Sequence, residues 1–328
     1  MKPKVFIARP IPKQVEDYIA EYCEVERWGK EEMISRDQLF EKIREVDGLL
    51  ISDGKIDAEL LDHAPRLKVV SNVSVGYNNF DLEAMKSRNV MGTHTPFVLD
   101  ETVADLVFSL MLAVARRIPE LDRYVKEGKW QKGDPSHLFG IDVHHATIGI
   151  IGMGRIGEAV AKRAKYGFNM DVLYYNRRPK REVEKSLGIR YAAKEELLRE
   201  ADFVILMTPL TPETTNLMGE TEFRLMKKNA IFVNASRGKA VDEQALIKAL
   251  EAKAIYGAGL DVFHQEPVSP DNPLLKMENV VALPHIASAT EKTQFNMAMI
   301  AAKNLVKAVK GEIPSNLVEE LKVLVKVE

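Results

Sequence analysis

The sequence feature that most constrains the fold is a glycine-rich segment, Gly-Met-Gly-Arg-Ile-Gly, in the middle of the chain. It follows the apolar run Thr147–Ile151 and precedes the helix-like stretch Glu158–Ala164. Between a strand and a helix, the first glycine permits a tight turn, the second lets the backbone approach a pyrophosphate, and the third brings the helix close to the strand. The segment therefore predicts a dinucleotide site at a helix N-terminus, and a simple turn in an α/β unit is the alternative. The three glycines are Gly152, Gly154 and Gly157.

Size and composition restrict the class of protein. A chain of 328 residues predicts two domains. A net charge of −2, with no basic tail or stripe, argues against nucleic acid as a partner. The single cysteine, Cys23, excludes an internal disulfide framework and suits a reducing cytosol. With no signal-peptide pattern and no apolar run long enough to span a bilayer, we expect a cytoplasmic protein that is independent of membranes.

The sequence contains no zinc-type cluster of cysteine and histidine. His144 and His145 are neighbours, and adjacent side chains diverge in a strand or a helix. We therefore expect no metal site.

Strand-like apolar runs alternate with helix-like stretches, which is typical of doubly wound parallel sheets covered by helices. In the first third of the chain the predicted strands are 5–8, 48–52, 67–71 and 90–92. In the middle they are 147–151, 170–175, 203–207, 230–234, 257–261 and 280–283. The fold class is therefore α/β, with two Rossmann-like domains.

The domains are predicted from the position of the glycine segment, which a lone Rossmann domain carries near its start. The long apolar helix 101–117 can leave a first domain and pack on a second, and the amphipathic helix 290–310 can return to the first. We expect a discontinuous, flavodoxin-like substrate-binding domain over 1–100 and 288–328, and a dinucleotide-binding domain over 101–287. Two crossovers predict a hinge and a cleft that holds the ligand.

The residues after the second strand of the cofactor domain indicate which dinucleotide binds. The position that usually carries an acidic residue for the ribose 2′-hydroxyl is Asn176, followed by Arg177 and Arg178. No carboxylate repels a 2′-phosphate there, and two guanidinium groups can bind one. This pattern favours NADP, with NAD possible. The alternative is that the arginines form a solvated turn.

Three predicted strands end in residues suited to one reaction. Arg237 follows the strand 230–234, Glu266 comes after the strand 257–261, and His285 follows the strand 280–283. Ligands gather at the carboxyl ends of parallel strands, where an arginine can hold a carboxylate. A glutamate bonded to the imidazole raises the pKa of the histidine, which can then protonate a carbonyl oxygen. Beside a nicotinamide, this trio predicts reduction of a 2-keto acid, with Arg237 and His285 binding substrate.

These motifs resemble the D-isomer-specific 2-hydroxyacid dehydrogenase family over essentially the whole chain. Within that family the chain is most similar to bacterial glyoxylate, hydroxypyruvate and 2-ketogluconate reductases. The resemblance lies in the glycine segment and in the stretches 74–80, 94–96, 101–105, 140–145, 208–214, 234–238, 259–263 and 284–285. One departure is Ala287, where the family commonly has glycine; alanine is strained there only if φ is positive.

The resemblance implies further site residues and a homodimer, with the helix 102–115 and the segment after it near the interface. It implies that Arg237, Glu266 and His285 are catalytic and that the backbone of Val75 and Gly76 contacts the substrate carboxylate. The cofactor contacts that it implies, besides the glycines and the residues after the second strand, are Thr102, Arg155, Ile156, Thr208, Pro209, Thr214, Ala235, Ser236, Asp261, His285 and Ser288. Thr208 and Thr214 flank prolines, so a turn role is the alternative for both.

The expected activity is NADPH-dependent reduction of 2-keto acids to D-2-hydroxy acids. We expect small polar substrates, because the predicted substrate loops 52–55 and 74–77 are polar, small or glycine-rich. Another dehydrogenase of the family is an alternative. An acidic residue at the Asn176 position would fit phosphoglycerate or D-lactate dehydrogenases better. A dinucleotide-sensing corepressor is the alternative from another class, although the chain shows no long charged tail for recruiting partners.

Overall fold

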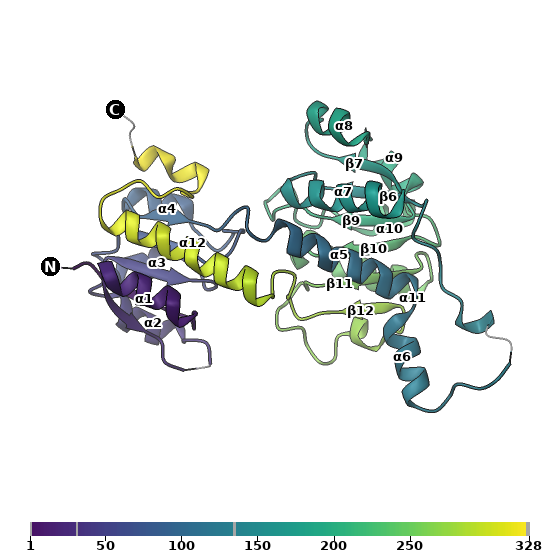
Figure 1. Cartoon of the computed structure of the whole chain (residues 1–328), viewed down its shortest axis with the longest axis horizontal. Helices are drawn as coiled ribbons and strands as arrows, with labels where there is room; N and C mark the ends of the chain where they lie inside the picture. The colour runs from purple at the N-terminus through teal and green to yellow at the C-terminus, as the bar shows by residue number, and fades with distance from the viewer. Residues whose placement is uncertain (1, 31, 134–135, 326–328) are drawn as a thin grey trace. The chain divides into compact units, whose positions relative to one another are not determined.

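The computed structural model describes residues 2–30, 32–133 and 136–325. The chain divides into two compact units, each built on an all-parallel sheet (Figure 1). Unit 1 comprises Met1–Leu99 and Ala289–Glu328, and unit 2 comprises Asp100–Ser288. Two parallel-sheet α/β units confirm the predicted fold class.

Unit 1 contains a five-stranded sheet in the order β2-β1-β3-β4-β5. Its strands are β1 (Lys4–Ile7), β2 (Glu24–Arg27), β3 (Gly48–Ile51), β4 (Val69–Asn72) and β5 (Met91–Thr93). The strand β2 was not predicted because its sequence, Glu-Val-Glu-Arg, has one apolar residue. It is the charged, mostly exposed edge of the sheet. The strands β3 and β4 are buried along their whole length. This explains the continuous apolar run of β3, whereas β4 ends in the buried polar residues Ser71 and Asn72.

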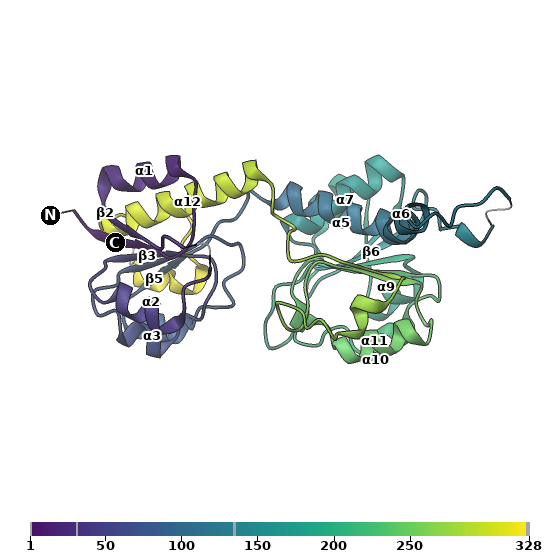
Figure 2. The same cartoon turned by 90° about the horizontal axis from the view of Figure 1, so that it is seen from below.

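Helices cover both faces of the unit 1 sheet. Figure 2 shows α1 (Lys13–Tyr22) and α12 (Glu291–Val309) on one face and α2 (Arg36–Ile43) and α3 (Ala58–Asp62) on the other. The remaining helices of the unit are α4 (Leu82–Ser87) and the 3₁₀ helix η4 (Glu319–Leu324). Helix α12 packs on β3 and β4, where the Ser71 hydroxyl donates a hydrogen bond to the Ala301 carbonyl at 2.7 Å. The C-terminal helix is thus part of the core of unit 1.

Unit 2 contains a seven-stranded sheet in the order β12-β11-β10-β9-β6-β7-β8. Its strands are β6 (Thr147–Ile151), β7 (Asp171–Tyr175), β8 (Arg190–Tyr191), β9 (Phe203–Leu206), β10 (Ile231–Asn234), β11 (Gly257–Leu260) and β12 (Val280–Ala282). The order reverses beside β6, which is the strand that leads into the glycine segment. The two-residue edge strand β8 was not predicted, since it is too short to show a periodic pattern.

The helices of unit 2 form two layers. Figure 2 shows α5 (Asp100–Ala115) and α7 (Arg155–Phe168) on one face of the sheet and α9 (Lys194–Glu200), α10 (Glu220–Leu225) and α11 (Glu243–Glu251) on the other. Helix α5 packs on α7, β10 and β11. The other helical segments are α6 (Ile118–Lys126), α8 (Arg181–Leu187) and the 3₁₀ turns η1 (Ser136–Leu138), η2 (Gly238–Ala240) and η3 (Pro273–Lys276). Within the described ranges, no helix combines the length and apolar character needed to cross a membrane.

The histidine pair of unit 2 corrects one expectation. His144 and His145 lie in a turn rather than in a strand or helix, and His145 has a φ of +60°. Their side chains therefore do not diverge, and the two Nδ1 atoms lie 2.9 Å apart. In the described part of the chain, no group of three His, Cys, Asp or Glu residues has an arrangement that could hold a metal ion.

Candidate active site

The glycine segment of unit 2 forms a turn between β6 and α7. Gly152 has a φ of +107°, and a Cβ atom there would lie 2.6 Å from the Met207 carbonyl oxygen, so only glycine fits. Gly154 is the N-cap of α7 and has open space beside it, while Gly157 lies in the first turn. The first hydrogen bond within the helix runs from the Glu158 amide to the Gly154 carbonyl. The amides of Arg155 and Ile156 come before it in the chain, so neither has a carbonyl partner within the helix. The turn has the form of an anion site at a helix N-terminus.

Asn176 holds this glycine turn in place. Its Oδ1 accepts a hydrogen bond from the Met153 amide at 2.8 Å, and its Nδ2 donates to the Met153 carbonyl at 3.3 Å. The sequence pattern gave no sign of this role. Arg177 and Arg178 are exposed, and no described residue forms a hydrogen bond or ion pair with either side chain. Both guanidinium groups therefore have donors available for a ligand.

Other predicted cofactor residues lie around the same turn. The Thr208 amide lies next to Gly152, and the buried Thr208 Oγ1 has no hydrogen-bond partner among the described residues. An orphaned buried hydroxyl at this position is consistent with a ligand-binding role. Thr102 lies in the first turn of α5, whose Asp100 accepts a 3.0 Å hydrogen bond from Arg155 Nε. These residues join the start of α5 to the glycine turn.

Thr214 has a structural role in the loop after β9. Its Oγ1 donates to the exposed Pro209 carbonyl at 2.6 Å and accepts a hydrogen bond from the Thr211 amide at 2.7 Å. These bonds close the loop on itself. The geometry therefore supports the turn interpretation of Thr214, in contrast to Thr208.

His285 and Glu266 form a hydrogen-bonded pair at the carboxyl ends of β12 and β11. His285 Nδ1 lies 2.8 Å from Glu266 Oε2. This bond raises the pKa of His285, against burial, which lowers it. Burial alone would raise the pKa of Glu266, but hydrogen bonds from His285 and the Phe263 amide bring it below its usual value. The pair thus favours an imidazolium beside a carboxylate, which is a proton donor held in a fixed orientation.

Arg237 belongs to the same group, because its charge acts on the pKa of both Glu266 and His285. Burial lowers the pKa of Arg237 itself. The turn that carries it is shaped by Asn234, whose Oδ1 accepts from Ser236 and whose Nδ2 donates to the Arg237 carbonyl at 3.0 Å. Ser236 and its neighbour Ala235 are buried. A partly buried arginine beside a histidine–glutamate pair can bind a carboxylate.

Gly238 is the contact point between the loop that carries Arg237 and the loop that carries Glu266. A Cβ atom at Gly238 would lie 1.7 Å from the Phe263 carbonyl oxygen and 2.0 Å from its carbon. Backbone therefore packs directly on backbone at this point, which only glycine allows. Because Phe263 leads into the loop of Glu266, this contact sets the position of Arg237 relative to Glu266.

Asp261 fixes the backbone that carries His285. His285 has a φ of +54°, a left-handed conformation that is uncommon for a residue with a side chain. The buried Asp261 carboxylate accepts hydrogen bonds from the amides of Ile286 at 2.8 Å and Ala287 at 2.9 Å, and its carbonyl accepts from the His285 amide. Burial raises the pKa of Asp261, against these hydrogen bonds, which lower it. Ala287 does not have a positive φ, so alanine is unstrained there, and Ser288 ends the unit.

The predicted substrate loop belongs to unit 1 and follows β4. His94 Nδ1 lies 2.9 Å from the Val75 carbonyl, and Asn72 Nδ2 donates to the Gly76 carbonyl at 2.9 Å. The side chains of His94 and Asn72 thus hold the Val75 and Gly76 carbonyls in place. No described residue accepts a hydrogen bond from the amides of Val75 or Gly76. Two adjacent amides held in this way are suitable donors for a carboxylate.

Sequence reasoning found the charged residues and missed those that position them. Asn72 and Asn234 each end a strand and hydrogen-bond the backbone of the loop that follows it. Asn176 follows β7 and hydrogen-bonds the glycine turn after the neighbouring strand β6. Their common signal is an asparagine at the carboxyl end of an apolar run, which also fits an ordinary turn. Only the structure distinguishes the positioning role of these asparagines from a simple turn.

Comparisons with known proteins indicate the family of the chain. Residues 108–287 match the family model described as "D-isomer specific 2-hydroxyacid dehydrogenase, NAD binding domain". The chain is 49% identical to a glyoxylate reductase from Korarchaeum cryptofilum over 98% of its own length and 97% of that protein. It is 46% identical to glyoxylate/hydroxypyruvate reductase B from Yersinia pestis, over 97% of this chain and 98% of that one.

A solved structure gives the same result. An NADPH-dependent glyoxylate/hydroxypyruvate reductase from Sinorhizobium meliloti, crystallised with NADP and malonate, matches with a TM-score of 0.85 and 31% identity. The match covers 98% of each chain. The chain therefore belongs to the D-isomer-specific 2-hydroxyacid dehydrogenase family, whose members are oxidoreductases that use a nicotinamide dinucleotide.

Proposed function

We propose that this protein reduces small polar 2-keto acids to D-2-hydroxy acids with NADPH. The substrates that we propose are glyoxylate, hydroxypyruvate and 2-ketogluconate. The observation that carries the proposal is the 2.8 Å hydrogen bond between His285 and Glu266, with the charge of Arg237 beside both. Relatives named for glyoxylate and hydroxypyruvate reduction support the first two substrates.

The residues of unit 2 fit a dinucleotide. The first turn of α7, with Arg155 and Ile156, suits the pyrophosphate, and the orphaned Thr208 hydroxyl suits a polar group of the bound molecule. Thr214 contributes by holding its loop in shape. The remaining proposed contacts to the cofactor are Thr102, Pro209, Ala235, Ser236, Asp261 and Ser288. When bound, the nicotinamide supplies the hydride for the keto carbon.

The residues of the chain perform the remaining chemistry. Arg237 binds the substrate carboxylate through its guanidinium, and the amides of Val75 and Gly76 donate to the same group. His285 holds the proton that neutralises the developing alkoxide and donates it to the carbonyl oxygen. Glu266 keeps that proton on His285 by stabilising the imidazolium and orienting the ring. In the reverse direction the neutral His285 accepts the proton from the hydroxyl group.

The preference for NADP rests on Arg177 and Arg178, which are exposed and form no hydrogen bond or ion pair with a described residue. A relative described as NADPH-dependent and crystallised with NADP supports this choice. Replacing both arginines with glutamine should lower the ratio of kcat/KM for NADPH to that for NADH by roughly tenfold or more, because charged hydrogen bonds to a phosphate are lost. An unchanged ratio would assign the 2′-phosphate to other residues.

A homodimer and a cytoplasmic location are part of the same proposal. Helix α6 has no buried residue, and Ile118 and Val125 on it are 53% and 52% exposed. Trp130 and Phe139 in the following segment are 71% and 66% exposed. Exposed apolar residues concentrated in this way favour an interface with a second copy of the chain. Analytical ultracentrifugation tests the dimer.

The activity is tested by following NADPH oxidation with glyoxylate, hydroxypyruvate, 2-ketogluconate and pyruvate, with NADH in parallel. We expect turnover of the polar keto acids and a preference for NADPH. Tight dinucleotide binding without turnover of any keto acid would instead favour the dinucleotide-sensing class.

A further inference from the structure

At the carboxyl edge of the unit 1 sheet, the side chain of one arginine, Arg9, makes no hydrogen bond or ion pair with the described residues of the fold. Arg9 follows β1 directly after Ala8, whose amide donates to the Leu50 carbonyl of β3 at 2.9 Å. The Arg9 side chain is partly buried, yet no described residue accepts a hydrogen bond from it or forms an ion pair with it. Burial lowers the pKa of Arg9, and no neighbouring carboxylate counteracts this. A partly desolvated guanidinium without a partner is a group that a ligand oxygen would stabilise.

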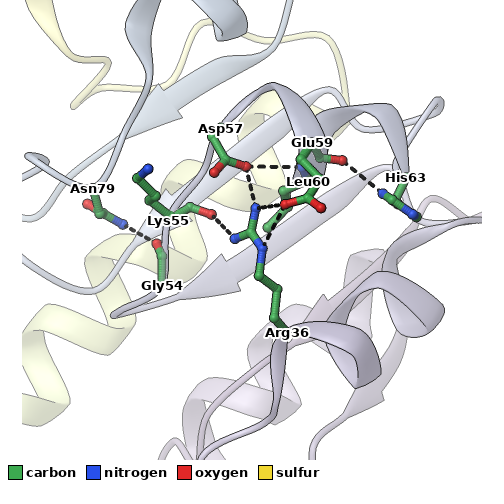
Figure 3. A network of polar contacts seen from close by, with 8 residues as sticks. All are labelled: Arg36, Gly54, Lys55, Asp57, Glu59, Leu60, His63 and Asn79. Atoms are coloured by element: carbon green, nitrogen blue, oxygen red, sulfur yellow. Dashed lines mark hydrogen bonds and ion pairs between the residues drawn. The ribbon is translucent and has the colours of Figure 1, made fainter.

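Arg36 shows how unit 1 normally treats an arginine. Figure 3 shows its guanidinium hydrogen-bonded to Asp57, Glu59 and the Lys55 carbonyl. Burial tends to lower the pKa of Arg36, but the bonds to Asp57 and Glu59 outweigh it and raise the pKa. Arg36 thus stabilises the loop after β3 through its hydrogen bonds, whereas Arg9 forms no such bond with a described residue. The contrast argues against a structural role for Arg9.

The position of Arg9 places it on the edge where a substrate is expected. The strand order β1-β3-β4 puts β1 two strands from β4, or about 10 Å in a regular sheet. The strand β4 leads into the loop of Val75 and Gly76, whose amides have no acceptor among the described residues. In open α/β sheets, ligands bind outside the carboxyl ends of the strands. Arg9 and the two amides therefore share one edge.

The other charged groups on this edge do not compete for Arg9. Between β1 and β4, the loop after β3 carries Asp53 and Lys55, both exposed. Asp53 accepts a 2.7 Å hydrogen bond from the Gly54 amide and makes no ion pair with Arg9. In Figure 3 the Lys55 side chain extends away from the polar network. The loop after β2, on the other side of β1, carries Lys30 and Glu32, which pair with each other at 3.3 Å. Between β1 and β4, the described residues thus offer one half-buried cation, Arg9, and one solvated cation, Lys55.

We propose that Arg9 recognises the distal end of the substrate, by hydrogen bonds to hydroxyl or carboxylate oxygens carried on C3 and beyond. The inference rests on the proposed function, with the substrate carboxylate at the Val75 and Gly76 amides. A guanidinium offers several donors in a fixed fork, which suits such oxygens. Glyoxylate has no atom beyond its aldehyde carbon, so it gains nothing from Arg9. Hydroxypyruvate has one distal hydroxyl and 2-ketogluconate has several.

The test compares Arg9→Met with Arg44→Met in the full-length protein, using glyoxylate and hydroxypyruvate with saturating NADPH. Arg44 is an exposed arginine directly after α2 and has no part in the proposed site. Losing a hydrogen bond from a charged donor should lower kcat/KM of Arg9→Met for hydroxypyruvate by roughly tenfold to a hundredfold. For glyoxylate we expect a change below about threefold, within the range of a surface substitution. The Arg44→Met control should leave kcat/KM for both substrates unchanged. Arg9→Lys should restore part of the hydroxypyruvate activity because a cation is present again.

Each outcome separates the two hypotheses. If the parent protein reduces neither keto acid, the proposed function fails and the role of Arg9 fails with it. If the parent reduces both and Arg9→Met keeps the parent's ratio of hydroxypyruvate to glyoxylate kcat/KM, the proposed function stands and Arg9 has no distal role. Equal losses for both substrates, with a lowered Tm, would make Arg9 a structural residue.

Discussion

The carboxyl edges of the two sheets are organised differently. In unit 2 the polar groups bond to one another: Glu266 to His285, Asp261 to the His285 loop, and Asn234 to the Arg237 turn. In unit 1 the side chains of Asn72 and His94 hold the carbonyls of Val75 and Gly76, whose amides have no acceptor among the residues that the structure describes. A group that must transfer a proton needs a tuned pKa and a fixed orientation, whereas a group that recognises substrate needs unfilled donors. Changes to the His285–Glu266 pair of unit 2 should therefore act on kcat, and changes to the Val75 loop of unit 1 on KM.

The largest effect should come from removing the proton donor. His285→Ala is expected to lower kcat by roughly 10²–10⁴-fold, the usual contribution of a positioned acid–base group. Dinucleotide binding, measured by NADPH fluorescence, should persist. A kcat within about tenfold of the parent's would contradict the acid–base role.

A smaller but broader effect is expected from the contact between loops. Gly238→Ala places a Cβ atom 1.7 Å from the Phe263 carbonyl oxygen, so the Arg237 and Glu266 loops must separate. We expect a stability loss of about 1–3 kcal/mol and a lower kcat. Gly167→Ala is the control, since Gly167 lies in α7 with nothing within 4 Å and should gain helix propensity. A Gly238→Ala variant with the parent's Tm and kcat would show that the loops separate freely.

The next prediction concerns pH. The hydrogen bond to Glu266 raises the pKa of His285, so the protonated form needed for reduction survives to higher pH. In Glu266→Gln the carboxylate charge is gone, the pKa of His285 falls, and the alkaline limb of kcat/KM for reduction should move to lower pH. Glu243→Gln is the matched control, because Glu243 binds the His264 amide and Asn272 rather than His285. An alkaline limb that stays in place would remove Glu266 from this role.

Sequence alone predicted much of this arrangement because apolar runs and glycine turns are local signals. The strand 147–151 was predicted at the limits observed, and the turn at Gly152 has the positive φ that such a turn requires. The exposed edge strands β2 and β8 were missed, since an edge needs no apolar alternation. Hydrogen bonds between side chains and distant backbone leave no periodic signal, which is why the asparagine roles were not foreseen. The catalytic and cofactor roles themselves stay predictions.

The smallest effect should come from unit 1, and it tests the comparison most directly. His94→Phe keeps an aromatic ring beside Tyr77, where the rings meet edge to face at 5.3 Å, but removes the hydrogen bond to the Val75 carbonyl. A net loss of about 0.5–1.5 kcal/mol corresponds to a rise in the KM for glyoxylate of roughly twofold to thirteenfold.

The control is His63→Phe, because His63 stacks on Phe40 and bonds the Glu59 carbonyl at the far end of α3. Its KM should match the parent's. In His94→Phe, kcat should stay within about twofold, since the proton donor and its partner are in unit 2 and keep their own hydrogen bonds. A fall in kcat with an unchanged KM would mean that the loop of Val75 shapes the reaction step. The division between a recognising loop in unit 1 and a reacting pair in unit 2 would then be wrong.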